Sequence, residues 1–219
     1  MEKFFSFRCI VPSSSLAKDN LRALFDHLAT VPNSTVMPLT DELTPHGTFD
    51  QFKSVGGANI RVSFVELFFD GTMNDTWKEE VNPPAGYDML FIDAPDWTLQ
   101  DMPEQLDALV EVLIDIFLRL QAIYGVGNID DAFEAEHRDF YGPLDVVGGL
   151  HFISGEVLER LDSTKPPLPE RYGDLAGGLW LRYDEDYFFG MDPKYKDSFS
   201  AFLPHLKKAI IEVVTQNQK

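Results

Sequence analysis

The sequence is short of cysteine and has no targeting signal. Among 219 residues only Cys9 is a cysteine, so no disulfide can form within the chain, which suits a reducing compartment. Residues 1–15 carry an apolar patch that Arg8 interrupts, and they contain no small-x-small cleavage site. We read this segment as a first strand and not as a signal peptide. These absences predict a cytoplasmic protein.

Positive charge is also scarce. Lys and Arg total 18 against 36 Asp and Glu, which gives a formal net charge of −18. Such a field repels nucleic acid phosphates and anionic lipid headgroups, so we expect no nucleic acid and no membrane as partner. It attracts a basic protein, and strong steering speeds association by about 10- to 10³-fold at low salt. Solubility alone is the simpler explanation of the same acidity.

Motifs that carry known chemistry are missing. No two histidines are spaced as HxH, HxxxH or HExxH, and the chain has no GxSxG elbow and no phosphate-binding Gly-Lys-Ser or Gly-Lys-Thr. Asp93 and Asp96 flank Pro95 like the first half of a nuclease motif, but no (Asp or Glu)-x-Lys follows. We therefore predict no catalytic residue, no metal site and no cofactor. The five histidines are His27, His46, His137, His151 and His205.

Two residues that could be reactive have structural interpretations. His151 stands at the start of a predicted strand, where a hydrogen-bonded core histidine is the favoured reading. Cys9 lies among aromatic residues within a predicted strand, where a buried and inert thiol is common. His27 and His205 fall on predicted helices as surface or boundary residues.

A long apolar helix is predicted over residues 101–125. Asp101 suits its N-cap, Pro103 its first turn and Gly125 the position after its last turn. Charged residues recur along it, which excludes a membrane span and favours a core helix. Its apolar positions, spaced by three and four residues, are Leu106, Leu109, Val110, Leu113, Phe117, Leu120 and Tyr124.

The remaining pattern predicts an α+β fold, with an antiparallel or mixed β-sheet packed by helices that include the long central one. Strict alternation of strand and helix is absent. We expect one domain over residues 1–219; a weak division into modules 1–98 and 99–219 is the alternative, suggested by three Gly-Gly pairs that precede strands. Strands are predicted at 4–11, 59–69, 87–94, 150–154 and 179–183, and further helices at 16–28, 129–140, 154–161 and 196–215.

Two acidic clusters stand out as binding surfaces. One lies on the predicted helix 129–140, and in the other Asp184, Glu185 and Asp186 precede three aromatic residues. Carboxylates beside aromatics supply both a steering charge and an anchor for a basic protein. The alternative is a solvated turn whose Phe188 and Phe189 return to the core. The predicted contact residues are Asp184, Glu185, Asp186, Tyr187, Asp130, Asp131 and Glu134.

The C-terminal third carries a family resemblance. Gly177-Gly178-Leu179-Trp180, the run to Asp192-Pro193 and the closing amphipathic helix through Ala209 resemble the immunity protein 52 family of bacterial polymorphic toxin systems. The resemblance covers the overall length, the N-terminal strand and helix and the part from Val146 onward, but not residues 33–86. It implies a cytoplasmic antidote to a restriction-endonuclease-like toxin delivered between competing bacteria, as in type VI secretion.

The leading hypothesis is thus an immunity protein that neutralises a nuclease-type effector toxin by stoichiometric binding, with the acidic residues above as its toxin-binding surface. An antidote needs no catalytic residue and gains from fast association with a basic toxin. A metal-dependent hydrolase that uses clustered carboxylates is the first alternative. A self-associating adaptor, or a homodimer, is the second.

Overall fold

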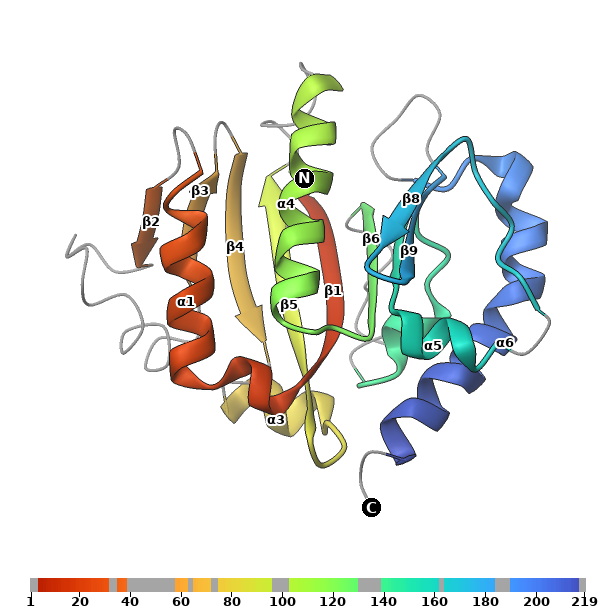
Figure 1. Cartoon of the computed structure of the whole chain (residues 1–219), viewed down its shortest axis with the longest axis horizontal. Helices are drawn as coiled ribbons and strands as arrows, with labels where there is room; N and C mark the ends of the chain where they lie inside the picture. The colour runs from red at the N-terminus through yellow and green to blue at the C-terminus, as the bar shows by residue number, and fades with distance from the viewer. Residues whose placement is uncertain are drawn as a thin grey trace.

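The computed structural model describes residues 4–31, 35–38, 58–62, 65–71, 75–95, 103–129, 139–161, 164–183 and 190–216. Within these ranges nine strands form one sheet in the order β2-β3-β4-β5-β1-β6-β7-β9-β8, with every neighbouring pair antiparallel (Figure 1). The strands are β1 (Phe4–Pro12), β2 (Thr35–Pro38), β3 (Ala58–Val62), β4 (Val65–Gly71), β5 (Tyr87–Pro95), β6 (Tyr124–Ile129), β7 (Leu150–Ile153), β8 (Arg171–Leu175) and β9 (Gly178–Arg182). The α+β prediction with an antiparallel sheet is confirmed.

Helices cover both faces of this sheet. They are α1 (Lys18–Leu28), α3 (Asp75–Val81), α4 (Pro103–Arg119), α5 (Gly155–Glu159) and α6 (Pro193–Gln216), with short 3-10 turns η1 (Ser13–Leu16) and η5 (Gly142–Asp145). None of the helices in the described ranges combines the length and the apolar character needed to cross a membrane.

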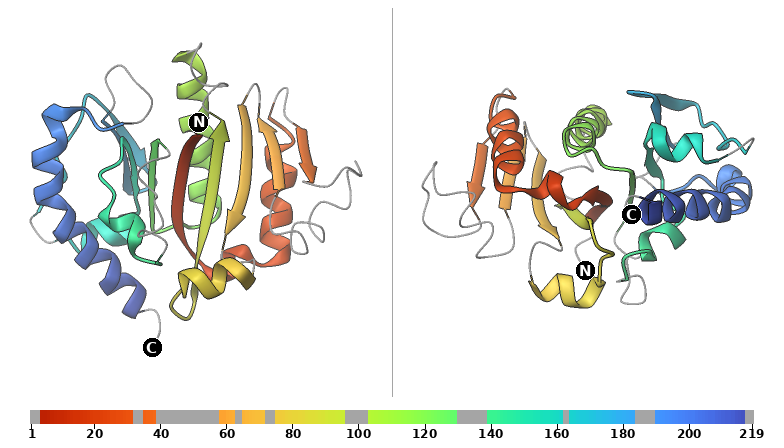
Figure 2. Two further views of the ribbon diagram at one scale, coloured as in Figure 1. Left: turned by 180° about the vertical axis from the view of Figure 1, so that it is seen from behind. Right: turned by 60° about the horizontal axis from the view of Figure 1, so that its bottom comes forward.

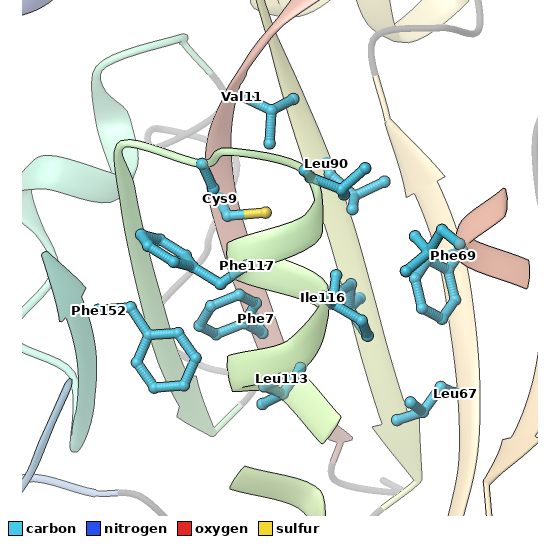
Figure 3. Packing of buried hydrophobic residues seen from close by; sticks show 14 of the residues in the cluster. Phe7, Cys9, Val11, Leu67, Phe69, Leu90, Leu113, Ile116, Phe117 and Phe152 are labelled. Carbon is cyan, nitrogen blue, oxygen red and sulfur yellow. The ribbon is translucent and has the colours of Figure 1, made fainter. Parts of the chain in front are cut away.

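The first core lies between the sheet and helices α1 and α4. The alternation of β1 points Phe5, Phe7, Cys9 and Val11 to this face. Figure 3 shows Leu113, Ile116 and Phe117 of α4 grouped with Phe7 and Cys9 of β1, with Phe152 of β7 to one side. The rings of Phe117 and Phe152 meet edge to face, with centroids 5.4 Å apart. The long central helix is therefore confirmed as a core helix.

The second core occupies the opposite face, where α6 and α5 pack (Figure 2). Ile10 of β1 points to this side, between the residues that β1 gives to the first core. A sheet buried on both faces needs strands that are apolar at successive positions, not alternating ones. This explains the continuous apolar run in β5. The α6 residues of this core are Phe199, Phe202, Leu206, Ala209, Ile210, Val213 and Val214.

Helix α4 ends six residues earlier than predicted. It stops at Arg119, and Gln121 takes the left-handed conformation with φ 51°. Ala122 N–H donates to Phe117 C=O at 2.9 Å, and Gln121 N–H to Leu118 C=O at 3.1 Å, which is the Schellman arrangement. The prediction that Gly125 follows the helix is wrong, because glutamine and not glycine fills the left-handed position.

Strand β6 therefore takes residues that had been assigned to the helix. Gly125 and Gly127 lie under the rings of Phe7 and Phe5 of β1, and a Cβ on Gly127 would come 2.7 Å from Phe5 Cζ. Glycine normally weakens a strand, but here the aromatic rings of the neighbouring strand fill the space over it. Tyr124 consequently belongs to β6 and not to the apolar stripe of the helix.

Other elements follow the sequence with local differences. The predicted strand 59–69 is a hairpin of β3 and β4, closed where Val62 pairs with Val65. The predicted helix 129–140 does not begin at Ile129, because that residue ends β6, and residues 130–138 lie outside the described ranges. The predicted helix 154–161 is α5, whose Ser154 hydroxyl accepts from Val157 N–H at 3.4 Å as an N-cap. Edge strand β8 was not predicted, because the preceding prolines suggested a connector.

Candidate protein-binding end of the sheet

The predicted contact residues all lie outside the described residues. This holds for Asp184, Glu185, Asp186 and Tyr187, and equally for Asp130, Asp131 and Glu134. Their role stays a prediction. The described residues that flank them do show where each acidic segment leaves the fold.

Both acidic segments begin at the same end of the sheet. The first follows Ile129, the last residue of β6, and the second follows Tyr183, one residue beyond β9. Both strands pair antiparallel with β7, through Gly127 with Leu150 and Leu150 with Arg182, so they run in the same direction. Because adjacent strands are about 4.8 Å apart, the ends of β6 and β9 are separated by roughly 10 Å. The topology therefore places Ile129 and Tyr183, which are far apart in sequence, near each other at one end of the sheet.

The segment 184–189 has its two ends tied together. Tyr183 N–H donates to Gly149 C=O at 2.7 Å, and Asp192 N–H donates to Tyr183 C=O at 2.9 Å. Gly190 forms a β-bridge with Gly148. The Tyr183 side chain is buried, and its hydroxyl donates to Pro167 C=O at 2.5 Å. The residues on either side of the acidic segment are thus held by backbone hydrogen bonds to β7 and to each other.

An aromatic cluster around His151 includes the Tyr183 ring. The His151 imidazole is 4.2 Å from the Phe199 ring and 5.9 Å from the Tyr183 ring, measured between centroids. His151 Nε2 is 2.8 Å from Gly148 C=O, which can only accept, so Nε2 carries the hydrogen. Nδ1 then accepts from the Tyr124 hydroxyl at 2.9 Å. Burial lowers the pKa of His151 to about 3, although its bond to Gly148 opposes this shift. The prediction of a satisfied structural histidine is confirmed.

Ion pairs connect α4 to β8 and β9, and β1 to β5. Asp107 of α4 lies 2.6 Å from Arg182 of β9 and 3.7 Å from Arg171 of β8, and Arg182 is only 5% exposed. Arg8 pairs with Asp93 at 2.7 Å. These pairs contain three arginines and two aspartates, so together they carry no net negative charge.

A second polar group lies between α1 and α4. Asp115 Oδ2 is 2.6 Å from His27 Nε2, and Arg119 binds Asp115 Oδ1 and His27 Nδ1, each at 3.0 Å. Since guanidinium can only donate, His27 Nδ1 accepts and Nε2–H donates to Asp115. Both ring nitrogens are engaged, so this group joins two helices and offers no free base. The sequence signal was the Asp115–Arg119 spacing of four residues on one helix face.

Two kinds of reactive group can be checked among the described residues: metal-ligand clusters and the cysteine thiol. Within those ranges no three His, Cys, Asp or Glu side chains come close enough to hold a metal ion. Cys9 is buried, and burial raises the pKa of its thiol to about 12, so the predicted inert thiol is confirmed. What the described part of the molecule offers is a set of fixed backbone positions, at Ile129, Tyr183 and Gly190, from which the chain enters and leaves the two acidic segments.

Neither a family model nor a curated protein matches the chain. Among solved structures, the T6SS protein PA0821 of Pseudomonas aeruginosa has a similar fold. The alignment has a TM-score of 0.53 at 11% sequence identity, and it covers 95% of this chain and 73% of that one. At this identity the likeness concerns the fold alone.

Proposed function

We propose that this chain is an immunity protein that binds a nuclease-type effector toxin and neutralises it by forming a stoichiometric complex. The observation that carries the proposal is the shared origin of the two acidic segments, at Ile129 and Tyr183, on one end of the sheet. Two segments that leave from neighbouring positions can contact one partner together. The described residues on either side of the second segment are held by backbone hydrogen bonds, from Tyr183 N–H to Gly149 C=O and from Asp192 N–H to Tyr183 C=O.

The fold likeness to a T6SS protein supports the same proposal. Immunity proteins protect cells against effectors of such secretion systems, and the resemblance of Gly177-Gly178-Leu179-Trp180 and the C-terminal helix points to the immunity protein 52 family. Membership of that family is part of the proposal, since no family model matches.

The partner is expected to present a basic surface. A nuclease binds nucleic acid phosphates with Lys and Arg, and a chain of net charge −18 is complementary to that surface. Binding there would block either the nuclease active site or its assembly. The antidote itself performs no reaction in this scheme, and it acts in the cytoplasm, where the toxin meets its substrate.

The direct test is co-expression with the effector encoded beside the gene of this chain. We expect growth to be restored and the two proteins to co-purify at equal molar amounts. An effector inactivated at its catalytic residue should bind equally well and serves as a non-toxic partner for titration. Absence of rescue against every adjacent effector would refute the proposal.

A titration separates this function from the hydrolase alternative. With purified effector, nuclease activity should fall linearly and reach zero at one equivalent of this chain. An enzyme that destroys the toxin or its product would act well below one equivalent, and divalent metal would change its rate. Inhibition that continues with turnover would therefore replace the immunity proposal by the hydrolase.

A further inference from the structure

Strand β8 is one edge of the sheet. It pairs with β9 on one side, and within the described residues no strand pairs with its other side. The two most exposed large apolar side chains of the described chain are close to it in sequence, Leu168 at 53% and Tyr172 at 50%. An open strand edge with exposed apolar neighbours is a template for pairing with another strand.

The turn between β8 and β9 determines which backbone groups point outward. Leu175 pairs with Gly178, and the two residues between them, Ala176 and Gly177, have φ of 50° and 88°, as in a type I′ turn. In such a two-residue hairpin the pair next to the turn is hydrogen-bonded, and hydrogen-bonded pairs then alternate along the ladder. Residues 171, 173 and 175 therefore bond to β9, while the N–H and C=O groups of Tyr172 and Asp174 point away from it.

We propose that this edge binds the same edge of a second copy of the chain, with the two-fold axis at Gly173. In this antiparallel register Tyr172 of one copy faces Asp174 of the other, so the outward groups form four hydrogen bonds across the axis. The tyrosine also lies beside a carboxylate that its hydroxyl can reach. Gly173 faces Gly173 at the axis, and because it has no side chain the strands can approach closely.

Charge selects this register over its neighbours. Pairing Tyr172 with Tyr172 would set Asp174 opposite Glu170, and pairing Asp174 with Asp174 would put two carboxylates together. Both put like charges opposite each other, which destabilises a strand pair. The Gly173 register has no facing like charges, and it sets Arg171 opposite Leu175. This self-complementarity favours a second copy over an unrelated strand.

The interface is small and the copies are both strongly acidic, so the dimer should be weak and dependent on salt. We expect a dissociation constant of about 10–100 μM, and tighter association as salt screens the repulsion between two chains of charge −18. Sedimentation velocity over about 1–500 μM chain, at low and moderate salt, measures both. A chain that is monomeric throughout that range would overturn the proposal.

Two pairs of variants test the edge and its register. Asp174→Pro removes an outward N–H and leaves the ladder to β9 intact, so it should abolish dimers, whereas Asp174→Ala keeps the N–H and should still dimerise.

The second pair of variants tests the register. Tyr172→Lys should tighten the dimer by roughly 2- to 30-fold, since each copy then sets an ammonium against Asp174 of the other, and Tyr172→Glu should weaken it similarly. The lysine and glutamate variants retain the fold even where proline does not, because Tyr172 is exposed.

The outcomes are specific to this register. If the lysine and glutamate variants behave alike, or the lysine variant dissociates, residue 172 does not face residue 174 and the proposal fails. The dimer proposal does not rest on the proposed immunity function. If the Asp174→Pro variant is monomeric and still binds the toxin, toxin binding does not require the dimer.

Discussion

The Tyr124 hydroxyl of β6 donates a hydrogen bond to Nδ1 of His151 on β7, with 2.9 Å between the two atoms, inside the second core. The direction is fixed because His151 Nε2–H already donates to Gly148 C=O at 2.8 Å. The imidazole is therefore neutral, with both nitrogens satisfied, in a site where a charge would have no counter-ion among these contacts. Burying the Tyr124 hydroxyl and the His151 imidazole costs little free energy, because the hydroxyl needs an acceptor and Nδ1 needs a donor, and each supplies the other.

This relationship predicts acid sensitivity. The folded-state pKa of His151 is about 3, below the ordinary value of 6.5, so the unfolded chain binds an additional proton between these two pH values. Its contribution to stability is complete above about pH 6.5 and is lost as the pH falls toward 3, at up to about 1.4 kcal/mol per pH unit. Chemical denaturation of wild type and His151→Gln across this window measures it, since glutamine does not titrate. The difference in unfolding free energy between the two proteins should shrink as the pH falls; a constant difference would contradict the assignment. His205→Gln, at an exposed position, is the control.

Removing the hydroxyl of Tyr124 should destabilise the fold. Tyr124→Phe leaves Nδ1 of His151 buried without its donor, which costs roughly 1–3 kcal/mol. Urea denaturation should show a lower midpoint with an unchanged slope. Tyr172→Phe is the matched control, because Tyr172 is 50% exposed and its loss of hydroxyl should change the monomer little. Equal stability of both variants would mean that the Tyr124 bond contributes nothing.

Glycine is required at position 125 of β6. A Cβ there would collide with the Phe7 ring, which is fully buried and packs against Phe152 with centroids 5.2 Å apart. Gly125→Ala should therefore cost about 1–3 kcal/mol through overpacking. A thermal melt checks this, and the double variant with Phe7→Leu should recover part of the loss relative to Phe7→Leu alone. If the two substitutions are simply additive, the ring does not cause the strain.

The thiol of Cys9 should report on global unfolding. It is buried in the first core with a pKa of about 12, so at pH 8 it is protonated and shielded. Reaction with Ellman's reagent should be slow for the native protein and immediate in denaturant. Because the chain has no other cysteine, the reaction rate across a denaturant series gives the population of open molecules. Prompt reaction of the native chain would show that the first core opens locally.

Charge at the second acidic segment should control how fast the effector binds. Reversing Asp184, Glu185 and Asp186 to lysine should reduce the association rate and make it less sensitive to salt, with a smaller effect on dissociation. Stopped-flow binding at several salt concentrations measures this. Reversing Asp197, Glu212 and Glu159 to lysine changes the net charge equally and serves as the control. If both triple variants slow association alike, only net charge matters and the interface lies elsewhere.

Much of the secondary structure could be predicted because local signals agreed with the fold. Strand β1, helix α1 and capped helix α5 each carried an apolar pattern with a recognisable start or end. The end of α4 and the start of β6 could not be predicted. There the left-handed position is held by Gln121, and the glycines of β6 are stabilised by rings from β1, which is distant in sequence. Local propensity carries no information on such a tertiary contact.

The candidate site could be predicted only in part. Composition indicated acidic segments, but the closeness of their flanking residues Ile129 and Tyr183 depends on β6 and β9 both pairing with β7. The predicted helices covered both ends of β6, and no strand was predicted there. The Asp115–Arg119 pair has a spacing typical of one helix face, but its contact with His27 was hidden, because it joins two helices whose packing the sequence does not specify.

The position of β1 has a consequence for biosynthesis. This strand is translated before the other eight described strands, yet it forms the centre of the sheet, and it joins β2–β5 on one side to β6–β9 on the other. Phe7 pairs with Ile92 and with Gly127, so neither neighbour exists until much of the chain has been translated. The apolar N-terminal strand must wait for both, and contacts this distant in sequence make folding slow and late. For the antidote function proposed above, this order of assembly predicts a delay between synthesis and toxin binding, so a cell would need a stock of folded molecules before a toxin arrives.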